Sequence, residues 1–195
     1  MTEGRTPPPD ISGLIPGHIF TREALDRAEF ANINQVLPKY ILKKPAGRTA
    51  PFNFSWFLKL HKEMFGEVWD WAGKLRRHRL NLGVDPARIA SELHAVQAGL
   101  GRWQEDKVAP IEIAVRLHYQ LVRIHPFAGG NGRWARMVSN IYLRKNGLPL
   151  ILWPEDRITV QKAVRDAYIA ALRRADQGDF KPLVELHKQY WDREH

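Results

Sequence analysis

Apolar residues recur at steps of three and four along most of this chain, and that spacing predicts a mainly helical protein. The segment 55–69 shows the pattern clearly, with inward positions at Phe57, Leu58, His61, Met64, Phe65 and Val68. The same periodicity predicts further helices from residue 22 onward and over 86–103, 110–125, 131–146, 156–171 and 181–191. We therefore expect an all-α fold arranged as a helical bundle.

Residues with special backbone preferences mark the ends of these helices. Thr21 is a suitable N-cap for the first helix, and Pro126 should stop the helix that begins at Pro110. Gly147 stands just past the expected end of the helix over 131–146. A short glycine-rich turn therefore separates two long helices at residues 126–130.

One segment departs from helical spacing. Residues 74–85 carry basic residues, a short polar–apolar alternation and the turn-forming pair Asn81 and Gly83. We expect one small β-hairpin here, exposed as a flap, with Arg76, Arg77 and Arg79 on its surface.

Composition narrows the class of protein. Hydrophobic residues make up 44% of the 195 residues and charged residues 26%, which is typical of a globular domain. Cysteine is absent, which excludes disulfides, thiol catalysis and thiolate metal sites. No stretch approaches the roughly 20 apolar residues of a membrane helix, and the first residues lack the apolar core of a signal sequence. We expect a cytoplasmic protein with no membrane partner.

The charge balance favours an anionic partner. Lys and Arg number 30 against 21 Asp and Glu, a net charge of +9. Nucleic acid, nucleotide phosphates and acidic proteins would all fit such a charge. Most of the tryptophans stand beside apolar positions, which favours core packing over stacking on bases and argues against nucleic acid as the partner.

The chemistry is concentrated between His125 and Arg136. A helix ends on an imidazole, a glycine-rich turn follows, and a second helix begins with its free N–H groups pointing back into the turn. Such N–H groups, with the positive end of the helix dipole, bind anions. Arg133 and Arg136 are three residues apart and project from one side of the new helix, where guanidinium groups suit phosphate oxygens. The segment is typical of a phosphate site beside a general base.

These residues resemble the motif of the Fic (Fic/Doc) family, His-x-Phe-x-(Asp/Glu)-Gly-Asn-Gly-Arg-x-x-Arg. The positions that match in register are His125, Phe127, Gly130, Asn131, Gly132, Arg133 and Arg136. The resemblance extends over roughly residues 50–190, because Trp71-Ala72-Gly73 and Gly178-Asp179-Phe180 are also similar to family segments. Gly13–Pro16 and Glu29–Ile33 are similar to the branch called mobile mystery protein B.

The resemblance implies an activity and a division of the chain. It implies a Fic-type domain over 51–195, preceded by a tail and helix over 1–50 with a regulatory role. Its activity would be transfer of AMP from ATP to a hydroxyl side chain of a target protein. His125 would be the base and Arg133 a catalytic charge, with Pro126 and Phe127 shaping the loop. The implied nucleotide-binding residues are Gly129, Gly130, Asn131, Gly132, Arg133 and Arg136.

One position departs from the motif. Gly129 stands where the family has the carboxylate that holds Mg²⁺ on the nucleotide. Three outcomes stay open: Mg²⁺ binds through phosphates and Asn131, another acidic residue reaches in, or the site binds nucleotide with little transfer. The last outcome leads to the alternative function, a degenerate nucleotide- or partner-binding module in a toxin–antitoxin-like pair.

Two further expectations come from the resemblance. Many Fic proteins are restrained by a glutamate that pairs with the second arginine of the motif, and Glu29 is the best candidate here, with Arg136 as its partner. Leu25 and Phe30 depart from the family's inhibitory pattern around that glutamate. The basic flap, with Arg76, Arg77 and Arg79, would dock an acidic segment of the target protein. His61 and His118 are expected to be hydrogen-bonded core residues.

Overall fold

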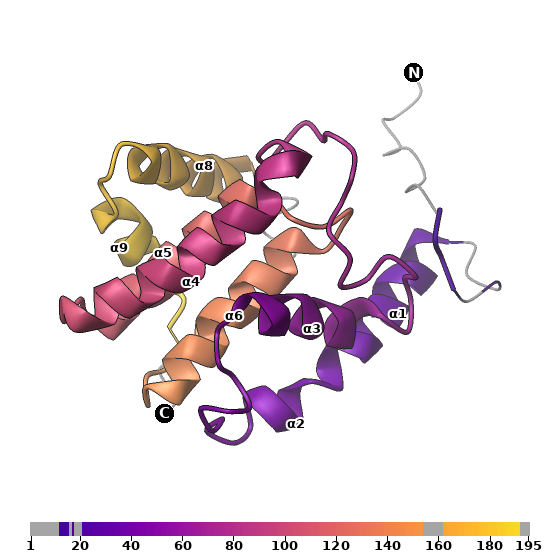
Figure 1. Ribbon diagram of the computed structural model, residues 1–195, viewed down its shortest axis with the longest axis horizontal. Helices are drawn as coiled ribbons and strands as arrows, with labels where there is room; N and C mark the ends of the chain where they lie inside the picture. Colours follow the sequence, from indigo (N-terminus) through magenta and orange to yellow (C-terminus); the bar gives the residue numbers. More distant parts are fainter. Residues whose placement is uncertain (1–11, 16, 18–20, 154–161, 192–195) are drawn as a thin grey trace.

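The computed structural model describes residues 12–15, 17, 21–153 and 162–191, and its regular elements in those ranges are helices (Figure 1). They are α1 (Arg22–Asn34), α2 (Leu37–Tyr40), α3 (Phe54–Phe65), the 3₁₀ helix η1 (Pro86–Arg88), α4 (Ile89–Glu105), α5 (Pro110–Ile124), α6 (Asn131–Lys145), α8 (Lys162–Asp176) and α9 (Lys181–Gln189). The expectation of an all-α fold is confirmed. The start of the helix expected from residue 156 lies outside the described residues.

Local signals set several helix ends as expected. The Thr21 hydroxyl accepts a hydrogen bond from the Ala24 N–H at 3.2 Å and caps α1. At the start of α3 the cap differs from the expected Ser55: it is Asn53, whose side chain accepts from the N–H of Trp56. Helix α5 begins at Pro110 and ends directly before His125 and Pro126.

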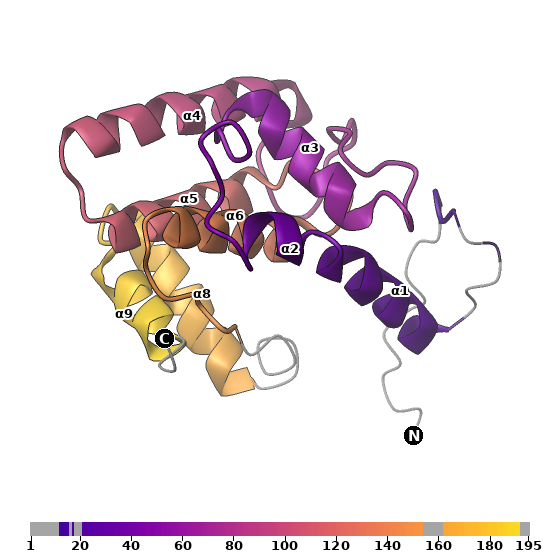
Figure 2. The same ribbon diagram turned by 90° about the horizontal axis from the view of Figure 1, so that it is seen from below.

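Helices α5 and α6 form the centre of the molecule. They make the most extensive contact between two helices in the described chain, with α3 and α4 on one side and α8 and α9 on the other (Figure 2). Trp134 of α6 is fully buried, and its Nε1 donates to the Phe57 carbonyl of α3 at 3.2 Å. This arrangement fixes the loop between α5 and α6 against α3.

A second, smaller core lies where α8 and α9 pack on α5. His118 and His187 are also buried on these helices, and Nδ1 of His118 lies 2.9 Å from Nε2 of His187. The Leu183 carbonyl accepts from Nδ1 of His187 at 2.7 Å, so His118 must donate to Nε2 of His187, and Tyr168 donates to Nε2 of His118 at 3.3 Å. The expectation that His118 is a hydrogen-bonded core residue is confirmed.

The β-hairpin expected over 74–85 does not form. The only β pairing in the described residues consists of isolated bridges, Leu14 with Trp69 and Ile151 with Trp191. Residues 74–85 instead form an irregular loop, because their backbone groups bond to the chain around His125 rather than to one another. We call this segment the flap loop. No helix in the described ranges is both long and apolar enough to cross a membrane.

Candidate nucleotide-transfer site

His125 stands at the rim of the site because of an unusual backbone conformation. It caps the end of α5 with φ 52° and ψ 62°, in the left-handed region that residues with a side chain rarely occupy. Pro126 follows directly and prevents α5 from continuing. The imidazole therefore leaves the buried face of α5 on which His118 lies. Its Nδ1 is buried, so the accessible edge of the ring is the one that carries Nε2.

The surroundings of His125 keep its ring neutral. Burial lowers the pKa of His125 and the nearby Arg76 guanidinium lowers it further, while the Val122 carbonyl acts in the opposite direction. A neutral imidazole near pH 7 has a lone pair that can accept a proton. This is the protonation state that a general base requires.

The turn after His125 is held by hydrogen bonds between two of its own residues. The side chain of Asn131 accepts from the Phe127 N–H and donates to the Phe127 carbonyl, both at 2.9 Å. Phe127 and Asn131 are buried, and Gly130 adopts φ 71° with its Cα facing the Phe65 ring, so that an added Cβ would lie 2.7 Å from it. Asn131 therefore orients the loop through its side chain.

A third histidine fixes the loop from the α3 side. The Gly73 N–H donates to Nδ1 of His61 at 3.0 Å, so Nε2 carries the proton and donates to the Gly129 carbonyl at 3.1 Å. The ring stacks on Phe127 with centroids 3.6 Å apart, and burial lowers the pKa of His61 to about 3. The expected core role of His61 is confirmed, but its contact with the loop had no signal in the sequence.

The two motif arginines face different neighbours. Arg133 forms an ion pair with Glu29 of α1 at 2.8 Å, and its guanidinium lies 5.0 Å from the centre of the Phe65 ring. Arg136 extends back along α6, where an added Cβ at Gly132 would lie 3.3 Å from its Nη1. Its charge also lowers the pKa of His118. Both guanidinium groups thus lie near the first turn of α6.

The predicted partner of Glu29 was wrong. Glu29 is 6% exposed and pairs with Arg133 rather than Arg136, and it also accepts from Nε1 of Trp69 at 2.7 Å. The reason is geometric, because α1 packs on α3, the side of α6 toward which Arg133 projects. The carboxylate of α1 thus reaches the first arginine of the motif and not the second.

The flap loop lies against His125, as expected, but Arg76 does not face solvent. Arg76 is 7% exposed, and its guanidinium donates to the carbonyls of His125 at 2.7 Å, His78 at 2.9 Å and Val84 at 2.5 Å. The prediction that Arg76 docks a target is therefore wrong, because its donors are used within the protein. Arg77 and Arg79 are exposed, and Arg79 pairs with Asp85.

Gly83 is a site residue that the sequence did not single out beyond its role in a turn. It has φ 100°, and a Cβ there would lie 2.7 Å from Cβ of His125 and 2.9 Å from the Ile124 carbonyl. Only glycine allows the flap loop to approach His125 so closely. The sequence carries no signal for this contact, because Gly83 and the end of α5 are far apart along the chain.

The residues present do not fit a metal held by the loop. Gly129 supplies no side chain, Asn131 is bonded to Phe127, and the Glu29 carboxylate is bonded to Arg133 and Trp69. A Cβ at Gly129 would lie 3.0 Å from the Trp71 ring. No group of three or more metal-ligating side chains occurs among the described residues. Of the three possibilities, binding of Mg²⁺ through the Asn131 side chain is therefore not supported.

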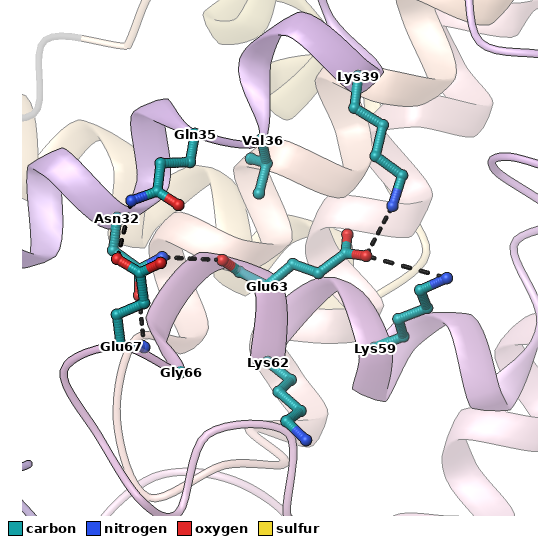
Figure 3. A pocket seen from close by; sticks show the side chains of 9 residues that line it. All are labelled: Asn32, Gln35, Val36, Lys39, Lys59, Lys62, Glu63, Gly66 and Glu67. Carbon is teal, nitrogen blue, oxygen red and sulfur yellow. Dashed lines mark hydrogen bonds and ion pairs between the residues drawn. The ribbon is translucent and has the colours of Figure 1, made fainter.

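A hollow of about 600 Å³ lies away from the loop, at the seam of α1, α2 and α3 (Figure 3). Its polar groups bond to one another: Asn32 donates to the Glu63 carbonyl and accepts from the Glu67 N–H, both at 3.0 Å. Glu63 also binds Lys39 at 2.6 Å and the Tyr40 hydroxyl at 2.8 Å. This seam holds α1, and with it Glu29, against α3.

Comparison with known proteins identifies relatives of this chain. Residues 51–143 match the model of the Fic/DOC family. Over 176 residues, or 85% of the chain, it is 29% identical to protein adenylyltransferase Fic of Aedes aegypti, of which the match covers 34%. Over 132 residues, or 65% of the chain, it is 31% identical to protein adenylyltransferase fic-1 of Caenorhabditis elegans, of which the match covers 25%. The chain thus spans about a quarter to a third of these curated relatives.

Solved structures agree with the fold. Fic-1 of Caenorhabditis elegans, residues 134–508, superposes with a TM-score of 0.68 at 25% identity, over 92% of this chain and 52% of the other. The BepC protein of Bartonella tribocorum, solved with bound AMPPNP, gives a TM-score of 0.67 at 18% identity over 94% of this chain and 98% of the other. The second similarity shows the fold alone.

Proposed function

The chain belongs to the Fic/DOC family, and on that premise we propose that it transfers AMP from ATP to a hydroxyl side chain of a target protein. The observation that carries this proposal is the position of His125, a neutral imidazole held by the flap loop beside the first turn of α6. The relatives named as protein adenylyltransferases and the nucleotide analogue bound to a similar fold support it.

The proposed reaction uses the chain's own residues in defined roles. Nε2 of His125 takes the proton from the target hydroxyl, and the hydroxyl oxygen forms a bond to the α-phosphorus. The bond from the α-phosphorus to the bridging oxygen breaks, and pyrophosphate leaves with the electron pair. Backbone N–H groups of Gly130, Asn131 and Gly132 bind phosphate oxygens, while Arg133 and Arg136 offset the charge of the leaving group.

Arg133 cannot serve a phosphate while it is paired with Glu29. We place Glu29 as an inhibitory residue, carried by the helix of the proposed regulatory unit over 1–50. Its carboxylate is nearly fully buried and has both Arg133 and Trp69 as partners, while the Arg133 side chain is 33% exposed. Release of α1 from its seam with α3 would free the guanidinium for ATP.

The target would dock on the flap loop. Arg77 and Arg79 remain exposed there, and Leu80 and Leu82 are exposed beside them. Basic and apolar side chains next to His125 favour an acidic target segment that also carries an apolar residue.

Transfer is tested with ATP labelled at the α-phosphate, using self-modification and lysate proteins as acceptors, with intact mass to count AMP groups. The proposal expects label on protein and its loss in His125→Asn. Failure of Glu29→Gly protein to take up label from any nucleoside triphosphate would overturn the transfer activity.

The role of Glu29 has its own test. Glu29→Gly should raise ATP affinity about tenfold, because it frees Arg133, and Glu29→Gly with Arg133→Ala should not. Asp26→Gly is the matched control, since it places a glycine in the same helix but removes an exposed carboxylate that pairs with Arg22. Equal effects of the two glycine variants would contradict an inhibitory role.

A second candidate function rests on Gly129. A loop without the motif carboxylate favours a module that binds nucleotide or an antitoxin-like partner with little transfer. ATP binding in calorimetry, with no label transfer in Glu29→Gly, would favour this function over the first.

A further inference from the structure

Of the six backbone carbonyl oxygens of residues 125–130, all but that of the exposed Ala128 accept hydrogen bonds from within the protein. Those of His125 and Pro126 accept from Arg76, at 2.7 Å from Nε and 2.9 Å from the backbone N–H. The next carbonyls have donors of their own. The Phe127 carbonyl accepts from Nδ2 of Asn131 at 2.9 Å, and the Gly129 carbonyl accepts from Nε2 of His61 at 3.1 Å. The Gly130 carbonyl accepts from the Trp134 N–H at 3.0 Å. Backbone oxygen is thus engaged on both sides of the turn.

In the part of the chain that the structure describes, the side-chain oxygens of Asn131 and Glu29 are engaged in the same way. Oδ1 of Asn131 accepts from Phe127, and both Glu29 oxygens have donors in Trp69 and Arg133. Divalent cations such as Mg²⁺ require oxygen ligands, and position 129 offers no side chain. The backbone N–H groups of Asn131, Gly132 and Arg133, by contrast, start α6 and have no acceptor within the helix. Among the described residues the loop therefore presents donors for an anion, while most of the acceptors that a cation needs are already bonded within the protein.

We infer that the loop binds the triphosphate of a nucleotide without a divalent cation held by the loop, and that Gly129 sets this preference. The inference rests on the proposed function, because it concerns the same nucleotide. The positive charge comes from Arg133, Arg136 and the N-terminal end of α6. A cation that accompanies the nucleotide is held by phosphate and water alone, and it adds no affinity through the protein.

Calorimetry with ATP tests the inference directly, in excess EDTA and in excess MgCl₂. The measurement is made on wild-type protein and on Glu29→Gly, in which Arg133 is free. The expected dissociation constants in EDTA and in MgCl₂ agree within about threefold. Binding that is at least about tenfold tighter with Mg²⁺ would overturn this inference while leaving the proposed function intact. Absence of binding in both conditions and both proteins would overturn the proposed function, and this inference with it.

A matched pair of substitutions isolates the missing carboxylate. Gly129→Asp and Gly129→Asn place side chains of the same shape against Trp71, but only the first adds the negative charge of the motif carboxylate. In Gly129→Asp, free ATP should bind about tenfold more weakly through charge repulsion, and Mg²⁺ should restore the affinity. Gly129→Asn should respond to Mg²⁺ as wild type does. Equal responses of the two variants would contradict the inference, and circular dichroism checks that both fold; if either does not, the comparison of EDTA and MgCl₂ on wild type decides.

Discussion

His118 and His125 lie seven residues apart on and at the end of α5, yet their surroundings differ completely. His118 is fully buried between α5, α8 and α9, and its two ring nitrogens are bonded to His187 and Tyr168. His125 is half-buried, leaves α5 in a left-handed conformation and keeps one edge of its ring accessible. The first histidine has every polar atom engaged, and the second has a nitrogen available for a substrate.

The difference teaches that a histidine's role is set by the elements around it rather than by its helix. Burial lowers the pKa of both residues, and neither ring is charged at neutral pH. A neutral ring inside a closed hydrogen-bond chain stabilises packing, whereas a neutral ring at a rim can accept a proton.

The largest expected effect is that substitutions at the two histidines separate AMP transfer from the stability of the fold. His125→Asn should lower AMP transfer by about 10²–10⁴-fold and leave the midpoint of urea unfolding unchanged. His118→Asn should do the reverse: the free energy of unfolding falls by about 2–4 kcal/mol, since His187 loses its buried donor, while transfer per folded molecule changes little. Label transfer and urea denaturation measure the two quantities, and a parallel loss in both variants would contradict the comparison.

The next effect is a loss of stability in acid. Burial lowers the pKa of His187 to about 4, and the pKa of His118 is lowered well below its ordinary value by burial, by His187 and by Arg136. The unfolded chain takes up protons near pH 6.5, so the stabilisation is complete above that pH and declines as the pH falls toward 4. The contribution of His187 is on the order of 3 kcal/mol.

Urea denaturation between pH 7 and 4.5 measures this loss. His187→Leu should flatten the pH dependence because it removes one of the buried titrating groups. A free energy of unfolding that is constant over this range in wild type would argue against the neutral buried pair.

A smaller effect is expected at the flap loop. Arg76→Met removes the donors to the carbonyls of His125, His78 and Val84, so the flap loop should be cleaved faster by protease and transfer should fall about tenfold. Arg77→Met is the control for cleavage, because the neighbouring side chain is exposed. Equal cleavage of the two variants would show that Arg76 does not hold the flap loop.

The smallest effect concerns Arg79. Its ion pair with Asp85 is exposed, so Arg79→Ala should change the free energy of unfolding by less than about 0.5 kcal/mol. Modification of an acidic peptide should nevertheless fall more than modification of its neutral counterpart, because the docking surface loses a charge. Competition between the two peptides measures this preference, and an unchanged ratio would remove Arg79 from target docking.

Much of the fold could be predicted because its signals are local. The helices expected over 110–125 and 131–146 are observed as Pro110–Ile124 and Asn131–Lys145, since Pro126 and Gly147 act on the adjacent backbone. The backbone conformation of the flap loop could not be predicted, because a hairpin and an irregular loop share the same turn residues. What separates them is the bonding of Arg76 and Val84 to residues 124–126. The narrower resemblance to the mobile mystery protein B branch stays a prediction.

The sequence by itself determined the order of the candidate functional groups along the chain: an imidazole at a helix end, a glycine turn and a helix start with two arginines. These features depend on backbone preferences and helix geometry within about a dozen residues. Only the tertiary structure decided that Glu29 pairs with Arg133, across 104 residues of chain, and that Arg76 is buried against His125. The physical reason is that the partner of a charged side chain is chosen by the packing of whole helices, which no local pattern encodes.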